Sequence, residues 1–224
     1  MNTRVNFSVE QARTNMIAQQ IRTWDVVEDR VLETLEQVPR ERFVPTGLEH
    51  LAFVDTQVPL GEEQCMLQPK VEARLLQALG LKASDSVLEI GTGSGYMAAL
   101  LSRHAQSVVS VEIRPAMVAM AKANLQKASI ENVTVLEGNG FSSEAPWAHR
   151  EVNVVIVSGG LPRRPDAFLS LLKPGGRLCA IVGVAPIMRA ILVTKTAQGQ
   201  SESVLFDTLV PMLESHPFAA QFRF

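Results

Sequence analysis

The spacing of apolar side chains divides the chain into two parts with different periodicities. Over roughly the first eighty residues, apolar positions recur every three or four residues, which is typical of helices that bury one face. The helices predicted there cover residues 9–24, 29–38 and 69–79. Residues 43–61 show no clean period, and we expect a loop with one short extended piece there.

Polar, proline and glycine residues mark the ends of these helices. Ser8 and Gln11 stand three positions apart at the start of the first helix, a spacing typical of a capping box. Pro69 suits the first turn of the third helix, and Gly80 suits its C-terminal end. These signals indicate where the first helix begins and where the third helix begins and ends.

From residue 86 onward, short apolar runs alternate with helical segments. The predicted strands are 87–90, 108–113, 133–136, 152–157 and 178–182, and the predicted helices are 94–104, 115–128 and 165–172. Because continuous apolar runs fit strands buried on both faces, we expect a parallel sheet that is covered on both faces, with right-handed crossovers. Residues 190–196 and 203–210 are predicted to form a closing antiparallel hairpin.

The predicted fold class is therefore α/β, with a doubly wound Rossmann-like sheet, a C-terminal antiparallel hairpin and an N-terminal helical extension. We expect residues 1–80 to form an extension or cap packed on the core, and residues 81–224 to form the ligand-binding core. The length of 224 residues agrees with one structural domain overall.

Composition excludes several classes of protein. Hydrophobic residues make up 46% of the chain, which argues against disorder, and the net charge of −2 gives no sign of nucleic acid or an anionic membrane as a partner. The longest charge-free apolar stretch has eleven residues, whereas a membrane-spanning helix needs about 20. Cys65 and Cys179 form neither a disulfide framework nor a metal motif. We expect a cytoplasmic protein without a bound metal.

A glycine-rich loop, Glu89-Ile90-Gly91-Thr92-Gly93-Ser94-Gly95, follows the first core strand and opens a helix. Glycines allow the backbone to turn sharply and to approach a ligand closely. Taken alone, the loop leaves three possibilities open: a nucleotide site, a related cofactor site or a plain turn.

Two carboxylates make the loop more informative. Glu112 ends the second strand, 21 residues after Gly91, where an acidic side chain can accept hydrogen bonds from both ribose hydroxyls. Glu89, just before the loop, would repel a phosphate but can accept from an ammonium or from backbone N–H groups. The pair favours S-adenosylmethionine, which carries a ribose and an adenine but no phosphate, over NAD. The alternative for Glu89 is a surface carboxylate at a strand end.

Further polar groups are predicted at the same edge of the sheet. Asn139-Gly140 follows the third strand, where Asn139 could meet an adenine amino group, and Ser158 ends the fourth strand. The alternative for each is an ordinary glycine turn. Arg163 and Arg164 follow the fourth strand and are candidates for orienting an acceptor carboxylate, with solvated loop charge as their alternative.

Several stretches together resemble the protein-L-isoaspartate O-methyltransferase family, over roughly residues 16–213. They are MIAQQIR at 16–22, VPRERFVP at 38–45, Leu60-Gly61 leading into Gln68-Pro69, VLEIGTGSGY at 87–96 and LKPGGRL at 172–178. The glycine loop is shared by many methyltransferases, whereas the N-terminal stretches set this family apart.

The resemblance implies a class I methyltransferase that transfers the methyl of S-adenosylmethionine to the α-carboxylate of isoaspartyl residues in damaged proteins. It implies that residues 210–213 close the acceptor pocket. The cofactor residues it implies, together with those singled out above, are Glu89, Gly91, Thr92, Gly93, Ser94, Gly95, Glu112, Ile113, Asn139, Gly140 and Ser158. The acceptor-site residues are Leu67, Gln68, Pro69 and Arg163.

The chain departs from the family pattern at three of these positions. The usual Thr-Ile-Ser-Gln-Pro reads Cys-Met-Leu-Gln-Pro at 65–69, so Leu67 stands at the serine position, and Asn139 stands at an aspartate position. The usual Thr-Ala-Ala at the end of the fourth strand reads Ser158-Gly159-Gly160. Three hypotheses follow: an isoaspartyl-repair methyltransferase, a methyltransferase of the same fold with a small-molecule or RNA acceptor, and a non-catalytic homologue that binds the cofactor. A dehydrogenase is a more distant fourth.

Overall fold

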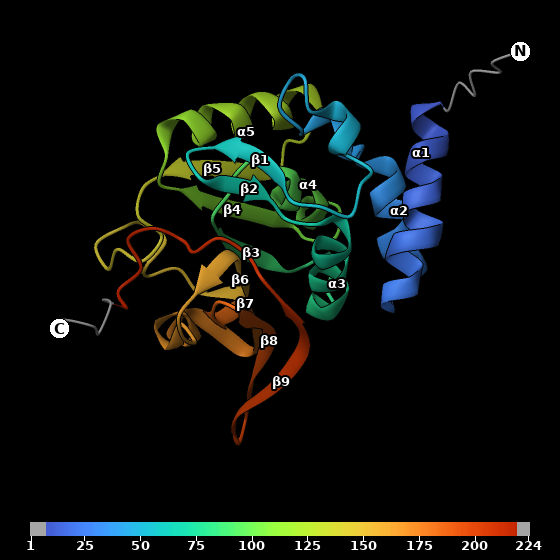
Figure 1. The fold of residues 1–224 in the computed structure, drawn as a ribbon. Coiled ribbons are helices and arrows are strands. Elements are labelled where there is room, and N and C mark those ends of the chain that lie inside the picture. Colours follow the sequence, from blue (N-terminus) through green and yellow to red (C-terminus); the bar gives the residue numbers. More distant parts are fainter. Residues whose placement is uncertain (1–7, 219–224) are drawn as a thin grey trace, which may run out of the picture.

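The core of the protein is one seven-stranded sheet, seen in a computed structural model that describes residues 8–218 (Figure 1). The strand order is β5-β4-β3-β6-β7-β8-β9. The strands are β3 (Ser86–Ile90), β4 (Ser107–Glu112), β5 (Val133–Glu137), β6 (Val152–Leu161), β7 (Leu172–Val184), β8 (Ile187–Thr196) and β9 (Gly199–Thr208). The first five strands in this order pair in parallel, and β8 and β9 continue the sheet in antiparallel fashion. The predicted fold class and closing hairpin are confirmed.

The two faces of the sheet are covered differently. On one face, buried residues of α3 (Pro69–Leu79), α4 (Tyr96–Ser102) and α5 (Pro115–Lys127) share a hydrophobic cluster with alternate strand residues such as Val154. On the other face, strand residues pack against Trp147 in the β5–β6 connection and against the 3₁₀ helix η5 (Asp166–Leu171). The sheet is therefore covered on both faces, as expected, although the cover of the second face is a 3₁₀ helix and connecting residues.

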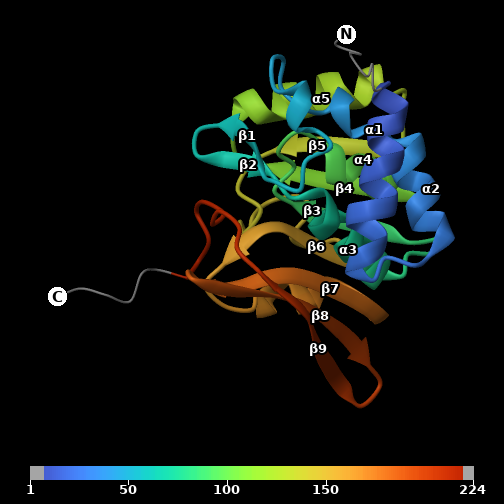
Figure 2. The same cartoon turned by 45° about the vertical axis from the view of Figure 1, so that its right-hand side comes forward.

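The N-terminal helices pack on the same cluster as α3. They are α1 (Val9–Met16), the π-helix η1 (Ile17–Ile21), the 3₁₀ helix η2 (Arg22–Trp24) and α2 (Asp29–Gln37). Figure 2 shows α1 and α2 stacked beside α3 at one side of the sheet. One of the two hydrogen bonds of the predicted capping box forms: the Ser8 hydroxyl accepts from the Gln11 backbone N–H at 3.1 Å. The Gln11 side chain donates to Asn15 instead of reaching back to Ser8.

A small hairpin lies outside the main sheet, next to the glycine loop. It joins β1 (Val58–Gly61) to β2 (Gln64–Met66), after the 3₁₀ helices η3 (Arg40–Arg42) and η4 (Glu49–Leu51). Only one extended piece was expected here. The turn residues Glu62 and Glu63 both have positive φ, a conformation that asparagine or glycine usually marks in a sequence, so the second strand carried no signal.

Two core elements differ from their predicted form. The helix expected over 165–172 is the 3₁₀ helix η5, and β7 begins directly at Leu172. Pro174-Gly175-Gly176, just after the range predicted for the helix, lies inside β7, where the pairing with β6 shifts from Val152–Leu172 to Val154–Arg177. The irregularity takes up a proline, which cannot donate to the ladder, and Gly175 with φ of +76°. No helix among residues 8–218 is long and apolar enough to cross a bilayer.

We predict that Gly95→Ala destabilises the protein more than Gly80→Ala. Both glycines end or begin helices with positive φ, +85° and +51°, so alanine strains the backbone at each. A Cβ at position 95 would also lie 3.2 Å from the Ala121 Cβ of α5, whereas nothing lies within 4 Å at position 80. Chemical denaturation should give a loss of about 1 kcal/mol for Gly80→Ala and about 2 kcal/mol or more for Gly95→Ala. Equal losses would contradict the close packing of α4 on α5.

Candidate functional site

The glycine loop connects β3 to α4 at the carboxyl edge of the parallel strands. Gly91, Gly93 and Gly95 all have positive φ, at +91°, +54° and +85°. A Cβ on Gly91 would lie 3.0 Å from Leu213, and one on Gly93 would lie 3.2 Å from Leu60 of β1. The loop therefore needs glycine both for its backbone path and for the side chains that cover it.

Two hollows meet at this loop. We call the first the α3 cavity; the space inside it that a water-sized molecule can reach is about 30 Å³. It is lined by Leu60, Cys65, Met66, Leu67, Glu72, Gly91, Thr92, Gly93, Ser94, Tyr96, Met97 and Ser158. We call the second the β4 hollow; it too has about 30 Å³ of space that a water-sized molecule can reach. It is lined by Ile90, Gly91, Val111, Glu112, Ile113, Gly138, Asn139, Gly140, Phe141, Leu213 and Glu214. Gly91 belongs to both, so the two hollows adjoin.

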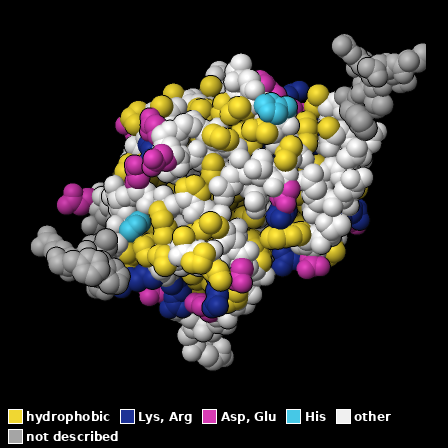
Figure 3. Space-filling model, viewed as in Figure 1, with side chains coloured by type: hydrophobic (Ala, Val, Ile, Leu, Met, Phe, Trp, Pro, Cys, Tyr) yellow, Lys and Arg dark blue, Asp and Glu magenta, His cyan; other side chains and the backbone are white. Residues whose placement is uncertain are grey.

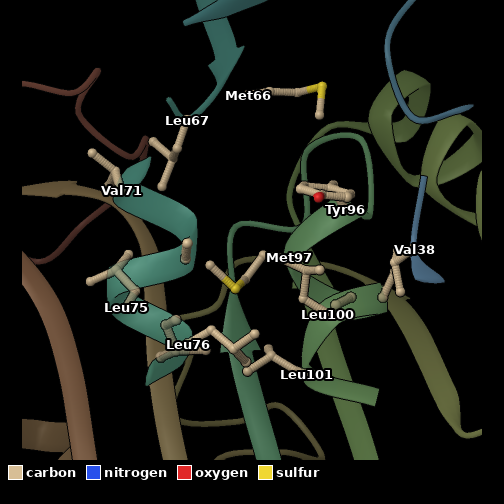
Figure 4. Packing of buried hydrophobic residues seen from close by; sticks show 14 of the residues in the cluster. Val38, Met66, Leu67, Val71, Leu75, Leu76, Tyr96, Met97, Leu100 and Leu101 are labelled. Atoms are coloured by element: carbon tan, nitrogen blue, oxygen red, sulfur yellow. The ribbon is translucent and has the colours of Figure 1, made fainter. Parts of the chain in front are cut away.

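The walls of the α3 cavity are largely apolar. Figure 4 shows Leu67 at the start of α3 and Tyr96 at the start of α4 on opposite sides, with Met97 between them. Hydrophobic side chains also gather across the middle of the outer face that carries the β1–β2 hairpin (Figure 3). The apolar part of the cavity wall can therefore pack against a ligand held at the glycine loop.

Glu89 lies beneath the loop and is completely buried, so its interpretation as a surface carboxylate is wrong. Ser110 donates to its Oε2 at 2.6 Å and Ser158 to its Oε1 at 2.8 Å, while the Thr92 hydroxyl contacts that of Ser110 at 2.6 Å. Burial raises the pKa of Glu89 to about 8, against the opposing effect of the two serine hydrogen bonds. Glu89 lines neither hollow; it orients hydroxyls that line the α3 cavity.

Glu112 lies in the β4 hollow, beside Ile113, and is 6% exposed. Its Oε2 accepts from the Gly93 backbone N–H and its Oε1 from the Arg114 backbone N–H, each at 3.0 Å. A carboxylate has about four acceptor positions, so both oxygens can accept a further hydroxyl. This arrangement suits a ribose with two adjacent hydroxyls.

Asn139 and Gly140 follow β5 and also line the β4 hollow. The Asn139 Oδ1 accepts from the Phe141 backbone N–H at 2.9 Å, which fixes the turn and leaves one lone pair for a ligand. A Cβ on Gly140 would lie 2.5 Å from Ile90, so no larger residue fits there. Apolar residues in the same lining, among them Ile90, Val111 and Phe141, suit an aromatic ring.

The predicted acceptor-site residues are only partly brought together. Leu67 lines the α3 cavity, whereas Gln68 and Pro69 begin α3 outside the lining. Arg163 lies 4.6 Å from the centre of the Phe218 ring and does not line the cavity. Arg164 is paired with Asp166 and Glu202.

Residues 210–213 cover the carboxyl end of β6. Gly160 donates its N–H to the Pro211 carbonyl at 2.8 Å, and Leu213 donates to the Gly160 carbonyl at 2.9 Å. Leu213 lines the β4 hollow, and none of these four residues lines the α3 cavity. The segment therefore lies over the junction of the two hollows at Gly91.

A buried ion pair that sequence reasoning missed forms one wall of the α3 cavity. Arg40 is fully buried in η3 and is paired with Glu72 of α3, which lines the cavity. A second nitrogen of Arg40 donates to the Leu67 carbonyl at 2.6 Å, and its guanidinium lies 5.0 Å from the centre of the Tyr96 ring. Burial raises the pKa of Glu72, and the charge of Arg40 opposes this rise. The sequence signal that could have indicated this pair was Glu72 itself, a carboxylate between Val71 and Ala73 in an otherwise apolar part of the helix.

The side chains present fit S-adenosylmethionine. The glycine loop can approach a ligand without a Cβ, Glu112 can accept from a ribose, and Asn139 lines the same hollow as Glu112. Among residues 8–218, no group of three or more His, Cys, Asp or Glu side chains could hold a metal ion.

Sequence comparison connects the chain with a known family. Residues 11–212 match the family model described as Protein-L-isoaspartate(D-aspartate) O-methyltransferase. A Protein-L-isoaspartate O-methyltransferase of Methanoculleus marisnigri is 36% identical over 195 residues, covering 86% of each chain. A Protein-L-isoaspartate O-methyltransferase 1 of Geotalea uraniireducens is 40% identical over 162 residues, covering 72% of this chain and 73% of its own.

Comparison with solved structures supports the fold. A Plasmodium falciparum structure described as a protein-L-isoaspartate O-methyltransferase in complex with S-adenosyl-L-homocysteine superposes with a TM-score of 0.79. It is 17% identical and the match covers 94% of this chain and all of that one. A second structure of that name gives a TM-score of 0.75 at 24% identity, covering 92% of this chain and 66% of its own.

We predict that the free energy of unfolding of the wild-type protein falls as the pH rises from about 5 to about 8, and that it falls less steeply in Glu89→Gln. The folded-state pKa of Glu89 is raised, so its stabilising contribution is present below the unfolded pKa and is lost as the pH rises through about 8. Glutamine does not titrate, so its slope should be smaller by up to about 1.4 kcal/mol per pH unit. Urea denaturation at several pH values measures this, with Glu151→Gln, at an exposed position before β6, as control. Parallel pH profiles for wild type and Glu89→Gln would contradict the raised pKa.

Proposed function

The chain belongs to the Protein-L-isoaspartate(D-aspartate) O-methyltransferase family, and on that premise we propose that it methylates the α-carboxylate of isoaspartyl residues in damaged proteins. The observation that carries this proposal is the junction of two hollows at Gly91. The β4 hollow suits an adenosine, and the adjoining α3 cavity suits the group that receives the methyl. We also propose a cytoplasmic location, which the two free cysteines, Cys65 and Cys179, favour.

The residues of the site suit a reaction that needs positioning rather than a strong base. When bound, S-adenosylmethionine supplies an electrophilic methyl group on a sulfonium. A carboxylate acceptor is already ionised at neutral pH, so no side chain has to remove a proton. Glu112 and Asn139 would hold the adenosine, while Thr92, Ser94 and Ser158 present hydroxyls along the cavity wall. Because no proton has to be removed, alignment of the acceptor with the methyl group supplies most of the catalysis.

A second candidate function keeps the cofactor and changes the acceptor. Leu67 gives the α3 cavity an apolar side chain at the position of the family serine, and Glu72 gives it a carboxylate. A methyltransferase with another acceptor would share the β4 hollow and differ only in the α3 cavity. Turnover on an isoaspartyl peptide separates the two functions.

We predict methyl transfer from S-adenosylmethionine to a peptide that contains one isoaspartyl residue, and none to the same peptide with normal aspartate. The measurement is incorporation of labelled methyl into base-labile ester at saturating cofactor. Cofactor binding by calorimetry without any transfer to the isoaspartyl peptide would contradict the proposed acceptor and favour the second function.

We predict that Glu112→Gln weakens the binding of S-adenosyl-L-homocysteine about 10- to 100-fold. Both carboxylate oxygens of Glu112 accept from backbone N–H groups, so in the variant the amide nitrogen would face one of these donors. The site would also lose one of the two oxygens that can accept from the ribose. Calorimetry measures the Kd. Glu137→Gln is the matched control, since Glu137 pairs in register with Glu112 at the end of β5 but is exposed. Equal affinity in both variants would remove Glu112 from the cofactor site.

A further inference from the structure

The α3 cavity contains two polar groups that cofactor binding leaves unexplained. Glu72 is 3% exposed and lines the cavity, and Tyr96, also in the lining, is 2% exposed. The Tyr96 hydroxyl is buried and has no hydrogen-bond partner among residues 8–218. A buried hydroxyl without a partner is costly in an apolar interior, so the Tyr96 hydroxyl beside the cavity indicates a polar ligand.

The position of Glu72 is fixed by Arg40. One Arg40 nitrogen is paired with the Glu72 Oε2, and another donates to the Leu67 carbonyl at 2.6 Å. The Glu72 Oε1 accepts no hydrogen bond from any residue between 8 and 218. Since Arg40 binds Oε2 and Glu72 lines the cavity, Oε1 is the acceptor atom left for a ligand.

The charge of the pair decides which ligand suits it. An ionised Glu72 alone would repel a carboxylate acceptor, but Arg40 balances its charge, so the wall is neutral as a whole. What the wall offers is a strong hydrogen-bond acceptor next to an apolar side chain, Leu67. A group that donates a hydrogen bond, such as an N–H, therefore binds better there than a carboxylate oxygen, which can only accept.

An isoaspartyl residue carries such a donor close to its reacting group. Its peptide N–H stands on the same carbon as the α-carboxylate. We propose, on the basis of the proposed function, that Glu72 is a specificity-determining residue whose Oε1 accepts a hydrogen bond from the N–H beside the acceptor carboxylate. The site thereby selects an acceptor by its nitrogen, at a place where the family serine would have offered a hydroxyl.

The test compares two acceptors in two proteins. One acceptor is a peptide with an N-acetylated isoaspartyl residue, and the other carries a succinyl group instead, which keeps the carboxylate and lacks the N–H. In Glu72→Gln, the one carbonyl oxygen remains with Arg40 and the amide nitrogen faces the cavity. We expect wild type to prefer the isoaspartyl peptide, in kcat/KM and in Kd with S-adenosyl-L-homocysteine bound, and Glu72→Gln to lose about 10-fold or more of that preference.

Two variants guard against a merely structural effect. Glu41→Gln changes a neighbouring ion pair, that of Glu41 with Arg13, and the Glu41 carboxylate does not line the cavity. This variant should leave the preference within about twofold of wild type. If Glu72→Gln does not fold, the double variant Arg40→Met/Glu72→Met removes both buried charges together and should show the same loss of preference. A structural role would weaken both acceptors equally.

The outcomes separate this proposal from the proposed function. An unchanged preference in folded Glu72→Gln overturns the role of Glu72 while transfer to isoaspartate stands. No methyl transfer by wild type to either peptide overturns the isoaspartyl function, and the ratio of the two Kd values then still tests Glu72. Equal Kd values of the two peptides for wild type would overturn recognition of the N–H.

Discussion

The buried guanidinium of Arg40 constrains the site more than any other single group. A buried charge is tolerated only when it is paired and hydrogen-bonded, and Arg40 finds its partners on two other elements. It is paired with Glu72 in α3, donates to the Leu67 carbonyl just before that helix, and faces the Tyr96 ring at the start of α4. The N-terminal region, α3 and α4 are thereby held in one arrangement, and the α3 cavity lies between them.

A second constraint comes from the carboxyl edge of the sheet. Parallel strands bring the residues that follow β3, β4, β5 and β6 to one edge, although they are far apart in the sequence. Glu89 holds hydroxyls beneath the glycine loop, and Glu112 holds the loop from the side through the Gly93 N–H. The two carboxylates thus do different work: one supports the loop from within, and the other has acceptor positions open to the β4 hollow.

Much of the fold could be predicted because its signals are local. Apolar runs, Pro69 and Gly80 determined strands and helices that agree with the structure within a few residues. The β1–β2 hairpin escaped prediction because two glutamates occupy its turn. The predicted range for β7 was too short because an irregularity in the pairing accommodates Pro174 within the strand. In the site, the glycine loop and Glu112 could be located by motif. The Arg40–Glu72 pair could not, because it joins residues 32 positions apart whose meeting depends on tertiary packing.

The central claim is that cofactor and acceptor occupy two adjoining hollows that meet at Gly91. A crystal structure of the protein with S-adenosyl-L-homocysteine tests it most directly. We expect both ribose hydroxyls within hydrogen-bond distance of Glu112, the adenine beside Asn139, and the sulfur directed toward the α3 cavity. An adenine bound away from the β4 hollow, or a ligand that leaves Glu112 without a new partner, would contradict the account.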